Sequence, residues 1–318
     1  MTKMKSKPLS ISGKATNGAL AIFFRTHFWD ECVEKVLEAL KACTSIPVKI
    51  SADVTKPFSM PNPELALRHD LQYFGSIGLP IYPNEQRTLW YNGDYPLYHF
   101  LENCDADYFI MVENDTFLSG VNLDDLSRLA IESDVEFMAA RVMDRTEGGW
   151  DYHASNQRRW LSAEFGVENN ARIFQSFFPF VFVSRRAVQH LKSRRLEMAK
   201  KLTEAGFNAK WPHAEAFVPT ELVRAGFKIA DICDISPGPI HLTLNIAFSV
   251  QEAQMNSELR FIHPVLAGHK LASKIICRGE QLAKEGKIKI GDWLSEQLSR
   301  NIDSDAKDAI RTRMSSIE

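Results

Sequence analysis

The first part of the chain follows a β-α-β pattern, which restricts the fold more than any other feature of the sequence. ALAIFF at 19–24 is a continuous apolar run, typical of a strand that is covered on both faces. Apolar residues then recur at the spacing of an amphipathic helix: Val33, Val36, Leu37 and Leu40. VKISADV at 48–54 predicts a second strand. Because parallel strands need a crossover connection, this order predicts a parallel sheet flanked by helices.

The composition is that of an ordinary globular protein: 318 residues, of which 45% are hydrophobic and 25% are charged. The net charge of −2 gives no support to a general polyanion binder, so we expect no nucleic acid partner. The five cysteines show no C-x-x-C spacing, which indicates free thiols in a reducing compartment. No apolar run is long enough for a membrane span, and the polar, basic residues 1–17 suit a disordered lead-in rather than a secretory signal. We therefore expect a cytoplasmic protein, with peripheral contact at the inner membrane face left open.

Further elements continue the α/β alternation. We expect strands at 107–112, 135–143, 177–184 and 228–233, and helices that begin at Asn62-Pro63, Asn92-Gly93-Asp94 and Asn122. The first of these helices takes its apolar stripe from Leu67, Leu71 and Phe74. Pro179 interrupts its strand, which predicts either an edge strand or a bulged one.

Two later segments have an unusual texture. Residues 144–172 are polar and rich in aromatic side chains, without clear periodicity, which predicts a functional loop or lid. A helix expected at 185–205 carries seven Lys or Arg residues between 185 and 201. The basic side chains of that helix have three open interpretations: a solvated face, a contact with a phosphate-rich acceptor, or a contact with an anionic membrane.

The strand at 107–112 ends in the acidic motif Glu113-Asn114-Asp115. Carboxylates two residues apart at a strand end point to the same side if the extended geometry persists. Such oxygens suit Mg²⁺ or Mn²⁺ that also contacts substrate phosphates. Ligand sites of parallel α/β sheets lie beyond the carboxyl ends of strands, where this motif falls. The alternative interpretation is a plain turn, because Asn and Asp are common turn residues.

Over residues 18–240 the order of these features resembles that of GT-A-fold glycosyltransferases, in which a D-x-D motif ends a strand. The resemblance implies an α/β, Rossmann-like fold with a mixed, mostly parallel sheet in a catalytic domain at 18–250. Within it, residues 18–120 form the nucleotide-sugar half and residues 121–250 the acceptor half. A helical C-terminal extension at 251–318 is expected to follow.

The resemblance also implies roles for single residues. Asp115 is expected to hold Mn²⁺ or Mg²⁺. Glu113 departs from the usual first Asp of the motif, and we expect it to contact a ribose or a metal-bound water. The resemblance implies that four further side chains lie near the donor nucleotide-sugar: those of Arg25, His27, Asp53 and Asp94. Outside the resemblance, each of these is an ordinary surface charge, turn residue or helix cap.

A second group of chemical residues lies in WPHAEAFVPTELV at 211–223. We expect a helix to begin near Phe217 to Pro219, so that His213 and Glu215 lie in the loop before it. By resemblance to inverting transferases, Glu215 is the base that takes the proton from the acceptor hydroxyl. The alternative is a carboxylate that is favoured near a helix N-terminus by the helix dipole. Glu221 is a weaker candidate, because we expect it on a solvated helix face.

The resemblance further implies a metal-binding histidine from the C-terminal region. His263 is the first choice, because it precedes a proline in an extended segment. His241 is the second choice and His269 the third. A lone histidine is otherwise a surface or cap residue.

These observations predict a metal-dependent, inverting glycosyltransferase with a nucleotide-sugar donor, a UDP-sugar by preference, and a glycan or glycolipid acceptor. One alternative is a nucleotidyltransferase that acts on a sugar phosphate, although its usual glycine-rich first loop is replaced here by RTHFWD. The other alternative is a non-catalytic binder of polyanions or membrane surfaces.

Overall fold

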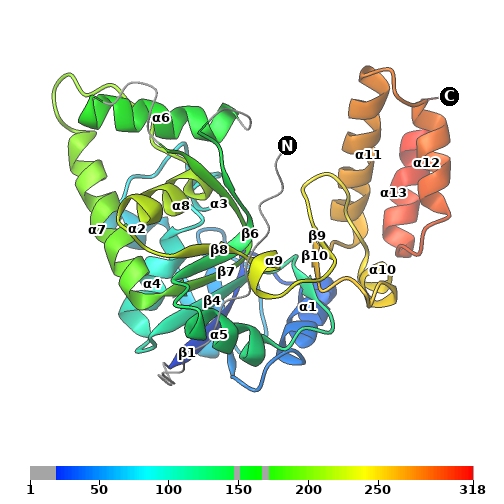
Figure 1. Ribbon diagram of the computed structural model, residues 1–318. Coiled ribbons are helices and arrows are strands. Elements are labelled where there is room, and N and C mark those ends of the chain that lie inside the picture. Colours follow the sequence, from blue (N-terminus) through cyan, green and yellow to red (C-terminus); the bar gives the residue numbers. More distant parts are fainter. Residues whose placement is uncertain (1–18, 147–150, 167–171, 318) are drawn as a thin grey trace, which may run out of the picture.

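The computed structural model describes residues 19–146, 151–166 and 172–317, so the lead-in expected at 1–17 lies outside the described residues. The protein is an α/β protein built on a mixed sheet (Figure 1). Within the described residues the main sheet has seven strands, which in spatial order are β3 (Leu67–His69), β2 (Val48–Asp53), β1 (Leu20–Thr26), β4 (Tyr108–Glu113), β7 (Phe174–Ser184), β6 (Phe137–Asp144) and β8 (Ile229–Asp231).

The sheet is mostly parallel. β1 pairs in parallel with both β2 and β4, β2 with β3, and β6 with β8. β7 is antiparallel to its two neighbours, β4 and β6. The prediction of a mixed, mostly parallel sheet with flanking helices is therefore confirmed. It follows from this order that the chain leaves β1 on one side to form β2 and returns to form β4 on the other side.

Alternate side chains of the central strands enter two separate cores. Phe24 and Ile110 belong to one core, whereas Phe23 and Phe109 belong to the other. The first core is covered by α1 (Glu31–Lys41), α5 (Leu123–Glu132), α9 (Ile232–Ile235) and α10 (Val250–Met255). The second is covered by α2 (Leu71–Ser76), α3 (Thr88–Tyr91), α4 (Tyr95–Asn103), α6 (Asp151–Phe165), α7 (Arg185–Lys201) and α8 (Ala214–Arg224). Since each fully buried Phe side chain contributes about 2 kcal/mol, both layers of helices are firmly attached.

Short polar side chains fix where several helices begin. Asp30 accepts the N–H of Val33 at the start of α1, and Ser184 accepts that of Ala187 at the start of α7. Asn122 accepts two N–H groups at the start of α5, so the predicted Asn122 cap is confirmed.

The prediction of a helix that begins at Asn62-Pro63 is wrong. Asn62 has a φ of 49°, and the chain forms only a short 3₁₀ turn at Pro63–Leu65. Leu67 then enters the edge strand β3. A new cap at Asp70, which accepts the N–H of Tyr73, starts α2. The apolar stripe therefore belongs to a strand and a short helix rather than to one long helix.

The segment 144–172, expected to be a loop, contains the helix α6 at Asp151–Phe165, and its residues 147–150 and 167–171 lie outside the described residues. The buried face of α6 includes polar side chains, so the sequence of this helix shows no apolar period. Gln157 is buried and donates to Glu221, and the buried Asn156 donates to the hydroxyl of Tyr91. Trp160 is also fully buried.

β7 lies inside the sheet, so the prediction of an edge strand is wrong. The alternative prediction, a bulged strand, is confirmed. Its pairing with β6 jumps from Val181 opposite Ala139 to Phe177 opposite Ala140. Pro179 falls in this jump. The missing N–H of proline therefore removes no ladder hydrogen bond at that point.

A second, small sheet carries a late part of the chain back to the end of β4. It consists of β5 (Phe117–Leu118), β10 (Phe261–His263) and β9 (Ile240–Leu242), with β10 in the centre. β10 is antiparallel to β5 and parallel to β9. Because β5 follows the acidic motif directly, this pairing brings His263 next to that motif.

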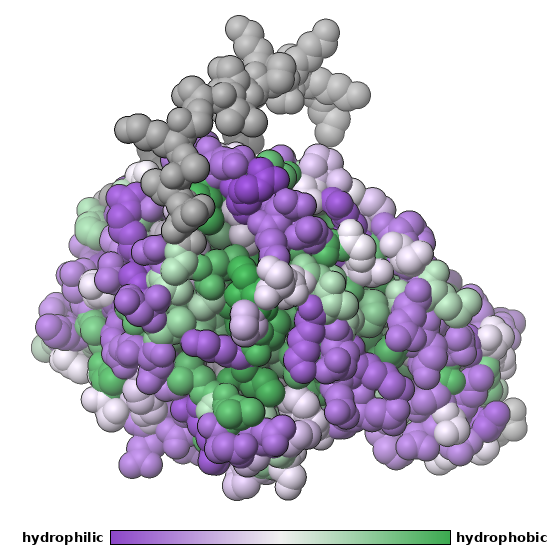
Figure 2. All heavy atoms as spheres, turned by 90° about the horizontal axis from the view of Figure 1, so that it is seen from below, coloured by the Kyte–Doolittle hydropathy of each residue, from purple (hydrophilic) through white to green (hydrophobic). Residues whose placement is uncertain are grey.

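Three further helices follow the small sheet: α11 (Gly268–Lys284), α12 (Ile290–Leu298) and α13 (Ser304–Ser315). They share a core of their own, in which Leu271, Leu294 and Ile310 are buried. Figure 1 shows them at the opposite side of the molecule from α6 and α7. On the face shown in Figure 2, hydrophilic residues cover most of this helical group, and apolar residues gather toward the middle of the molecule. Among the described residues no helix has both the length and the apolar character needed to cross a membrane.

Candidate functional site

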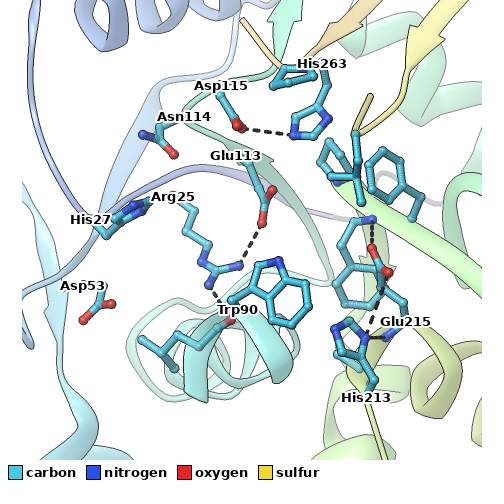
Figure 3. Close-up of a pocket in the computed structure, with 18 of the residues that line it drawn as sticks. Arg25, His27, Asp53, Trp90, Glu113, Asn114, Asp115, His213, Glu215 and His263 are labelled. Atoms are coloured by element: carbon cyan, nitrogen blue, oxygen red, sulfur yellow. Dashed lines mark hydrogen bonds and ion pairs between the residues drawn. The ribbon is translucent and has the colours of Figure 1, made fainter. Parts of the chain in front are cut away.

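A cavity of about 540 Å³ lies beyond the carboxyl ends of β1, β2 and β4 (Figure 3). This is where the strand order reverses around β1, which is the usual ligand site of open α/β sheets. Seven of the eight predicted site residues line the cavity: Arg25, His27, Asp53, Glu113, Asp115, Glu215 and His263. Elements that are far apart in the sequence therefore converge on one place.

Asp115 and His263 form the most defined pair in the cavity. The Nε2 atom of His263 lies 3.4 Å from Oδ1 of Asp115, while the other ring nitrogen, Nδ1, lies 3.1 Å from the carbonyl oxygen of Thr243. That carbonyl selects the tautomer with the proton on Nδ1, which leaves Nε2 directed at Asp115. Burial opposes protonation of His263, but the Asp115 charge outweighs it and raises the pKa of the imidazole. Burial acts against ionisation of Asp115, and the His263 charge reverses this and lowers the pKa of the carboxyl.

Glu113 is held by Arg25 on the neighbouring strand. The Nη1 atom of Arg25 lies 3.0 Å from Oε1 of Glu113, and Nη2 donates to the carbonyl of Leu89 at 2.7 Å. Burial raises the pKa of Glu113, with the Arg25 charge acting in the opposite direction. The longer first carboxylate of the motif therefore reaches the β1 cation as well as the cavity.

One ligand atom each from Glu113, Asp115 and His263 lies within 4.8 Å of the other two. Two carboxylates and an imidazole suit Mn²⁺ well and Mg²⁺ with added water ligands. The donor set therefore fits the cation that the sequence predicted. Asp115 and His263 are the more available ligands, because Glu113 already pairs with Arg25.

Glu215 lies in the first turn of α8 rather than in a loop before the helix, so the start expected near Phe217 to Pro219 is wrong. The helix begins at Ala214, and Nδ1 of His213 accepts the N–H of Glu215 as its cap at 3.2 Å. Pro219 is tolerated inside the helix because the carbonyl that it leaves without an amide, that of Glu215, accepts the hydroxyl of Ser176 at 3.3 Å.

The carboxyl group of Glu215 faces the cavity from the wall opposite Asp53 (Figure 3). Its Oε1 atom accepts the N–H of Phe178 at 3.3 Å. Burial raises the pKa of Glu215 to about 8, against the effect of that hydrogen bond. A carboxyl group with a pKa near the working pH is suited to act as a general base or acid.

Asp94 is not a ligand contact, which corrects the sequence-based assignment. Its side chain is 0% exposed and pairs with Arg195, whose side chain is also 0% exposed. The hydroxyl of Tyr98 donates to the same carboxylate at 2.5 Å. Only the preceding residue, Gly93, reaches the cavity, where a β-carbon would come within 2.9 Å of Phe178.

The adjacent aromatic residues Trp90 and Tyr91 differ in their exposure. Trp90 is 56% exposed and lines the cavity, whereas Tyr91 is buried and donates its hydroxyl to the carbonyl of Trp211 at 2.8 Å. On the β2 side of the cavity, Asp53 accepts the N–H of Thr55 at 3.0 Å, which fixes the carboxylate at the end of β2.

The other late histidines and Glu221 lie elsewhere. His241 on β9 lines a separate cavity, and His269 at the start of α11 is exposed. Glu221 is buried and pairs with Arg194 at 3.1 Å, so the prediction of a solvated position is wrong.

The basic helix is mainly structural. Ion pairs with carboxylates involve Arg185, Arg186, Lys192, Arg194, Arg195 and Lys201. Arg194 and Arg195 are buried, so a fully solvated face is wrong for this helix. Few cationic side chains of this helix are therefore available to contact a membrane or a phosphate-rich acceptor.

A histidine pair on the Glu215 side of the cavity was not predicted from the sequence. The rings of His153 on α6 and His213 have their centres 3.8 Å apart, and both residues line the cavity. Burial lowers the pKa of His153 to about 4 and that of His213 well below its usual value, so both are neutral at pH 7. Their ligand atoms and that of Glu215 also lie within 4.8 Å of one another. Because Nδ1 of His213 already accepts an N–H, this cluster suits a hydroxyl-bearing ligand better than a metal.

The fold and the cavity define a class: an α/β protein with a Rossmann-like sheet and a carboxylate–histidine cluster at the carboxyl ends of its strands. No protein-family model matches the chain, and no curated protein is significantly similar to it in sequence. The functional assignment therefore rests on the cavity itself.

Proposed function

We propose that the chain is a metal-dependent glycosyltransferase of the GT-A type, which moves a sugar from a nucleotide-sugar donor to an acceptor hydroxyl with inversion. One observation carries this proposal: the Asp115–His263 pair and the half-buried Glu215 face the same cavity from separate elements. A cation site and a separate proton acceptor are the two groups that such a transfer needs.

The metal end of the cavity suits a diphosphate. Asp115 and His263 are the proposed ligands of Mn²⁺ or Mg²⁺, with Glu113 in support. When bound, the cation offsets the negative charge that develops on the departing nucleoside diphosphate. Arg25 adds a second positive charge beside this position, and Lys56 and Lys274 also line the cavity.

The β1–β2 side of the cavity suits the nucleoside. Asp53 offers a fixed carboxylate to ribose hydroxyls or to a base N–H, and His27 lies beside it. Burial and the neighbouring Arg25 lower the pKa of His27, so its imidazole is neutral and can stack or hydrogen-bond. A UDP-sugar is the donor that we propose.

Glu215 is the proposed base. As the acceptor oxygen attacks the anomeric carbon, its proton passes to the Glu215 carboxylate and the bond from that carbon to the diphosphate oxygen breaks. The neutral His153 and His213 and the exposed Trp90 ring, which lie beside Glu215, suit the hydroxyls and the apolar face of a sugar. We propose a glycan or glycolipid acceptor in the assembly of a surface polysaccharide or glycolipid.

Thermal-shift and calorimetric titration with UDP and UDP-sugars, with and without Mn²⁺, tests the proposal. We expect stabilisation by UDP that requires Mn²⁺ and is lost in Asp115→Asn, because the cation links the diphosphate to the protein. Glu132→Gln, on the exposed part of α5, is the matched control and should retain it.

The products distinguish transfer from its closest rival. A glycosyltransferase releases nucleoside diphosphate from a nucleotide-sugar, whereas a nucleotidyltransferase releases pyrophosphate from a nucleoside triphosphate. Metal-dependent binding of nucleoside triphosphate and release of pyrophosphate contradict the proposal, as does the absence of any nucleotide binding.

A further inference from the structure

A second cavity of about 440 Å³ adjoins the first. Arg141, Thr243 and Asn245 line both cavities, so the segment after β9 forms part of the wall between them. A molecule bound in the second cavity can therefore extend past this segment toward Glu215.

Arg141 connects the two cavities electrostatically. It has a φ of 54°, a left-handed conformation that non-glycine residues rarely adopt, and it lies at an irregularity in the pairing of β6 with β7. Such bulges re-aim a side chain, and the Arg141 guanidinium lies 5.6 Å from the centre of the Phe177 ring. Burial dominates the pKa of both Glu215 and His241, and the Arg141 charge lowers the pKa of each. The cation is thus within electrostatic range of the proposed base and of the second cavity.

The second cavity also holds a second cation without a carboxylate partner. Arg278 on α11 lines it and donates to the side-chain oxygen of Gln281 at 3.1 Å. Within the described part of the chain, neither Arg141 nor Arg278 forms an ion pair. The buried Nε2 atom of His241 has no hydrogen-bond partner among the described residues. Two guanidinium groups and an imidazole form a favourable setting for a phosphate group.

The remaining wall of this cavity is apolar. It is formed by Ile240, Leu242, Ile246, Leu282 and Trp293. Trp293 packs directly on the α11 backbone, since a β-carbon at Gly279 would lie 2.4 Å from its ring. Ile246 is 50% exposed and the nearby Leu244 is 49% exposed, so apolar surface continues out to solvent. Cations beside an extended apolar wall suit a molecule with an anionic group and an apolar chain.

We propose that the second cavity is an acceptor subsite whose ligand is a phosphate ester of an apolar alcohol, that is, a lipid phosphate. Arg141 and Arg278 bind the phosphate, and the chain lies along Trp293 and its apolar neighbours. The acceptor role rests on the proposed glycosyltransferase function, whereas the binding of the amphiphilic phosphate does not. This proposal also assigns a role to the C-terminal helices, because α11 and α12 form one wall of the subsite.

Isothermal titration of the full chain with octyl phosphate below its micellar concentration tests the proposal, without metal or nucleotide. We expect octyl phosphate to bind at least about tenfold more tightly than inorganic phosphate or octyl glucoside, because each of these lacks one half of the ligand. Arg278→Gln should weaken octyl phosphate about tenfold, which is typical for the loss of one charge-assisted hydrogen bond to phosphate. Arg141→Gln should weaken it similarly.

Arg311→Gln is the matched control, because Arg311 is an exposed arginine on α13 that pairs with Asp308 outside the cavity. Its octyl phosphate affinity should equal that of the wild type, and thermal melting establishes that all variants are folded. Equal affinity for inorganic phosphate and octyl phosphate contradicts the lipid assignment. Unchanged binding in both cavity variants overturns the subsite. Either result leaves Mn²⁺-dependent UDP binding untouched, so failure here is distinguishable from failure of the proposed function.

Discussion

The carboxylate of Asp94 accepts two hydrogen bonds from the guanidinium group of Arg195, at 2.8 and 3.1 Å, although 101 positions separate the two residues. Both side chains are fully buried. The guanidinium group also lies 3.7 Å from the centre of the Phe217 ring and 4.8 Å from that of Trp211. The pair therefore joins the start of α4 to α7 and α8 behind the cavity.

Replacement of one partner of this pair leaves the other charge buried without compensation. We expect Asp94→Asn to lower the free energy of unfolding by about 3 to 5 kcal/mol. Urea denaturation measures the change. Asp53→Asn, at the cavity, should alter stability by only about 0.5 kcal/mol, because its oxygen can still accept the N–H of Thr55. An equal stability of Asp94→Asn and the wild type contradicts the structural role of Asp94.

The misassignment of Asp94 shows which parts of the site the sequence can predict. Glu113 and Asp115 follow from a local pattern, because they end an apolar strand, whereas Arg25 and Asp53 were implied by the resemblance and by their positions at the ends of predicted strands. The ion-pair partner of Asp94 lies on a helix that the sequence could not place beside it. Asp94 therefore resembled a free turn carboxylate.

The fold divides in the same way. The β1-α1-β2 unit has clean apolar periods and was predicted, whereas α6 buries Gln157 and Asn156 and has no visible period. The small sheet consists of strands of two and three residues. Such strands are too short to show an apolar period in the sequence. From the sequence, His263 is distinguished only by its position before a proline in an extended segment. Its distance of 3.4 Å from Asp115 follows only from the pairing of β10 with β5.

Protonation of His263 should compete with metal binding. The Asp115 charge raises the pKa of His263, and a metal ligand must be the neutral imidazole. Below that raised pKa, each metal ion that binds displaces a proton from His263. We therefore expect the Mn²⁺ affinity to fall about tenfold for each unit by which the pH is lowered further. Calorimetry in buffers with different ionisation enthalpies measures both the affinity and the released proton.

His263→Gln is the control for this pH dependence. We expect it to weaken Mn²⁺ binding at pH 8 and to remove the proton release between pH 8 and pH 6. Persistence of the same proton release in this variant assigns the effect to another group and contradicts the role of His263.

The Arg25–Glu113 ion pair should have opposite effects on metal and nucleotide. In Arg25→Met, Glu113 loses its partner at 3.0 Å and the cavity loses one positive charge. We expect the Mn²⁺ affinity of the free protein to rise severalfold, because a carboxylate becomes available and a repulsive charge is removed. The affinity for UDP in the presence of saturating Mn²⁺ should fall about tenfold, because the diphosphate loses a cationic partner.

Equilibrium dialysis with Mn²⁺ and titration with UDP measure the two affinities of Arg25→Met separately. Lys35→Met, on the exposed face of α1, is the matched control for the loss of one positive charge. If Arg25 is an ordinary surface charge, neither affinity differs from that of the control.

Glu215→Gln should slow transfer strongly and yet stabilise the protein at alkaline pH. Loss of the base is expected to lower the transfer rate by a factor of about 10² to 10⁴, with nucleotide binding retained. In the wild type the rate should increase with pH as the carboxyl group loses its proton. The midpoint of this rise lies at a pH of about 8 without metal, and a bound cation moves it lower.

The stability of Glu215→Gln separates a catalytic carboxyl from a structural one. Burial raises the pKa of Glu215 from 4.5 to about 8, so the native state binds this proton more tightly than the unfolded state. The native state is therefore favoured at acid pH, and this contribution is lost as the pH rises from about 4.5 to about 8. Glutamine carries no such proton, so the melting temperature of the variant relative to the wild type should increase by about 2 to 5 °C between pH 5 and pH 9. A structural carboxylate, ionised in the native state and held by its hydrogen bond from Phe178, predicts the reverse: a variant that is less stable at pH 9 than the wild type.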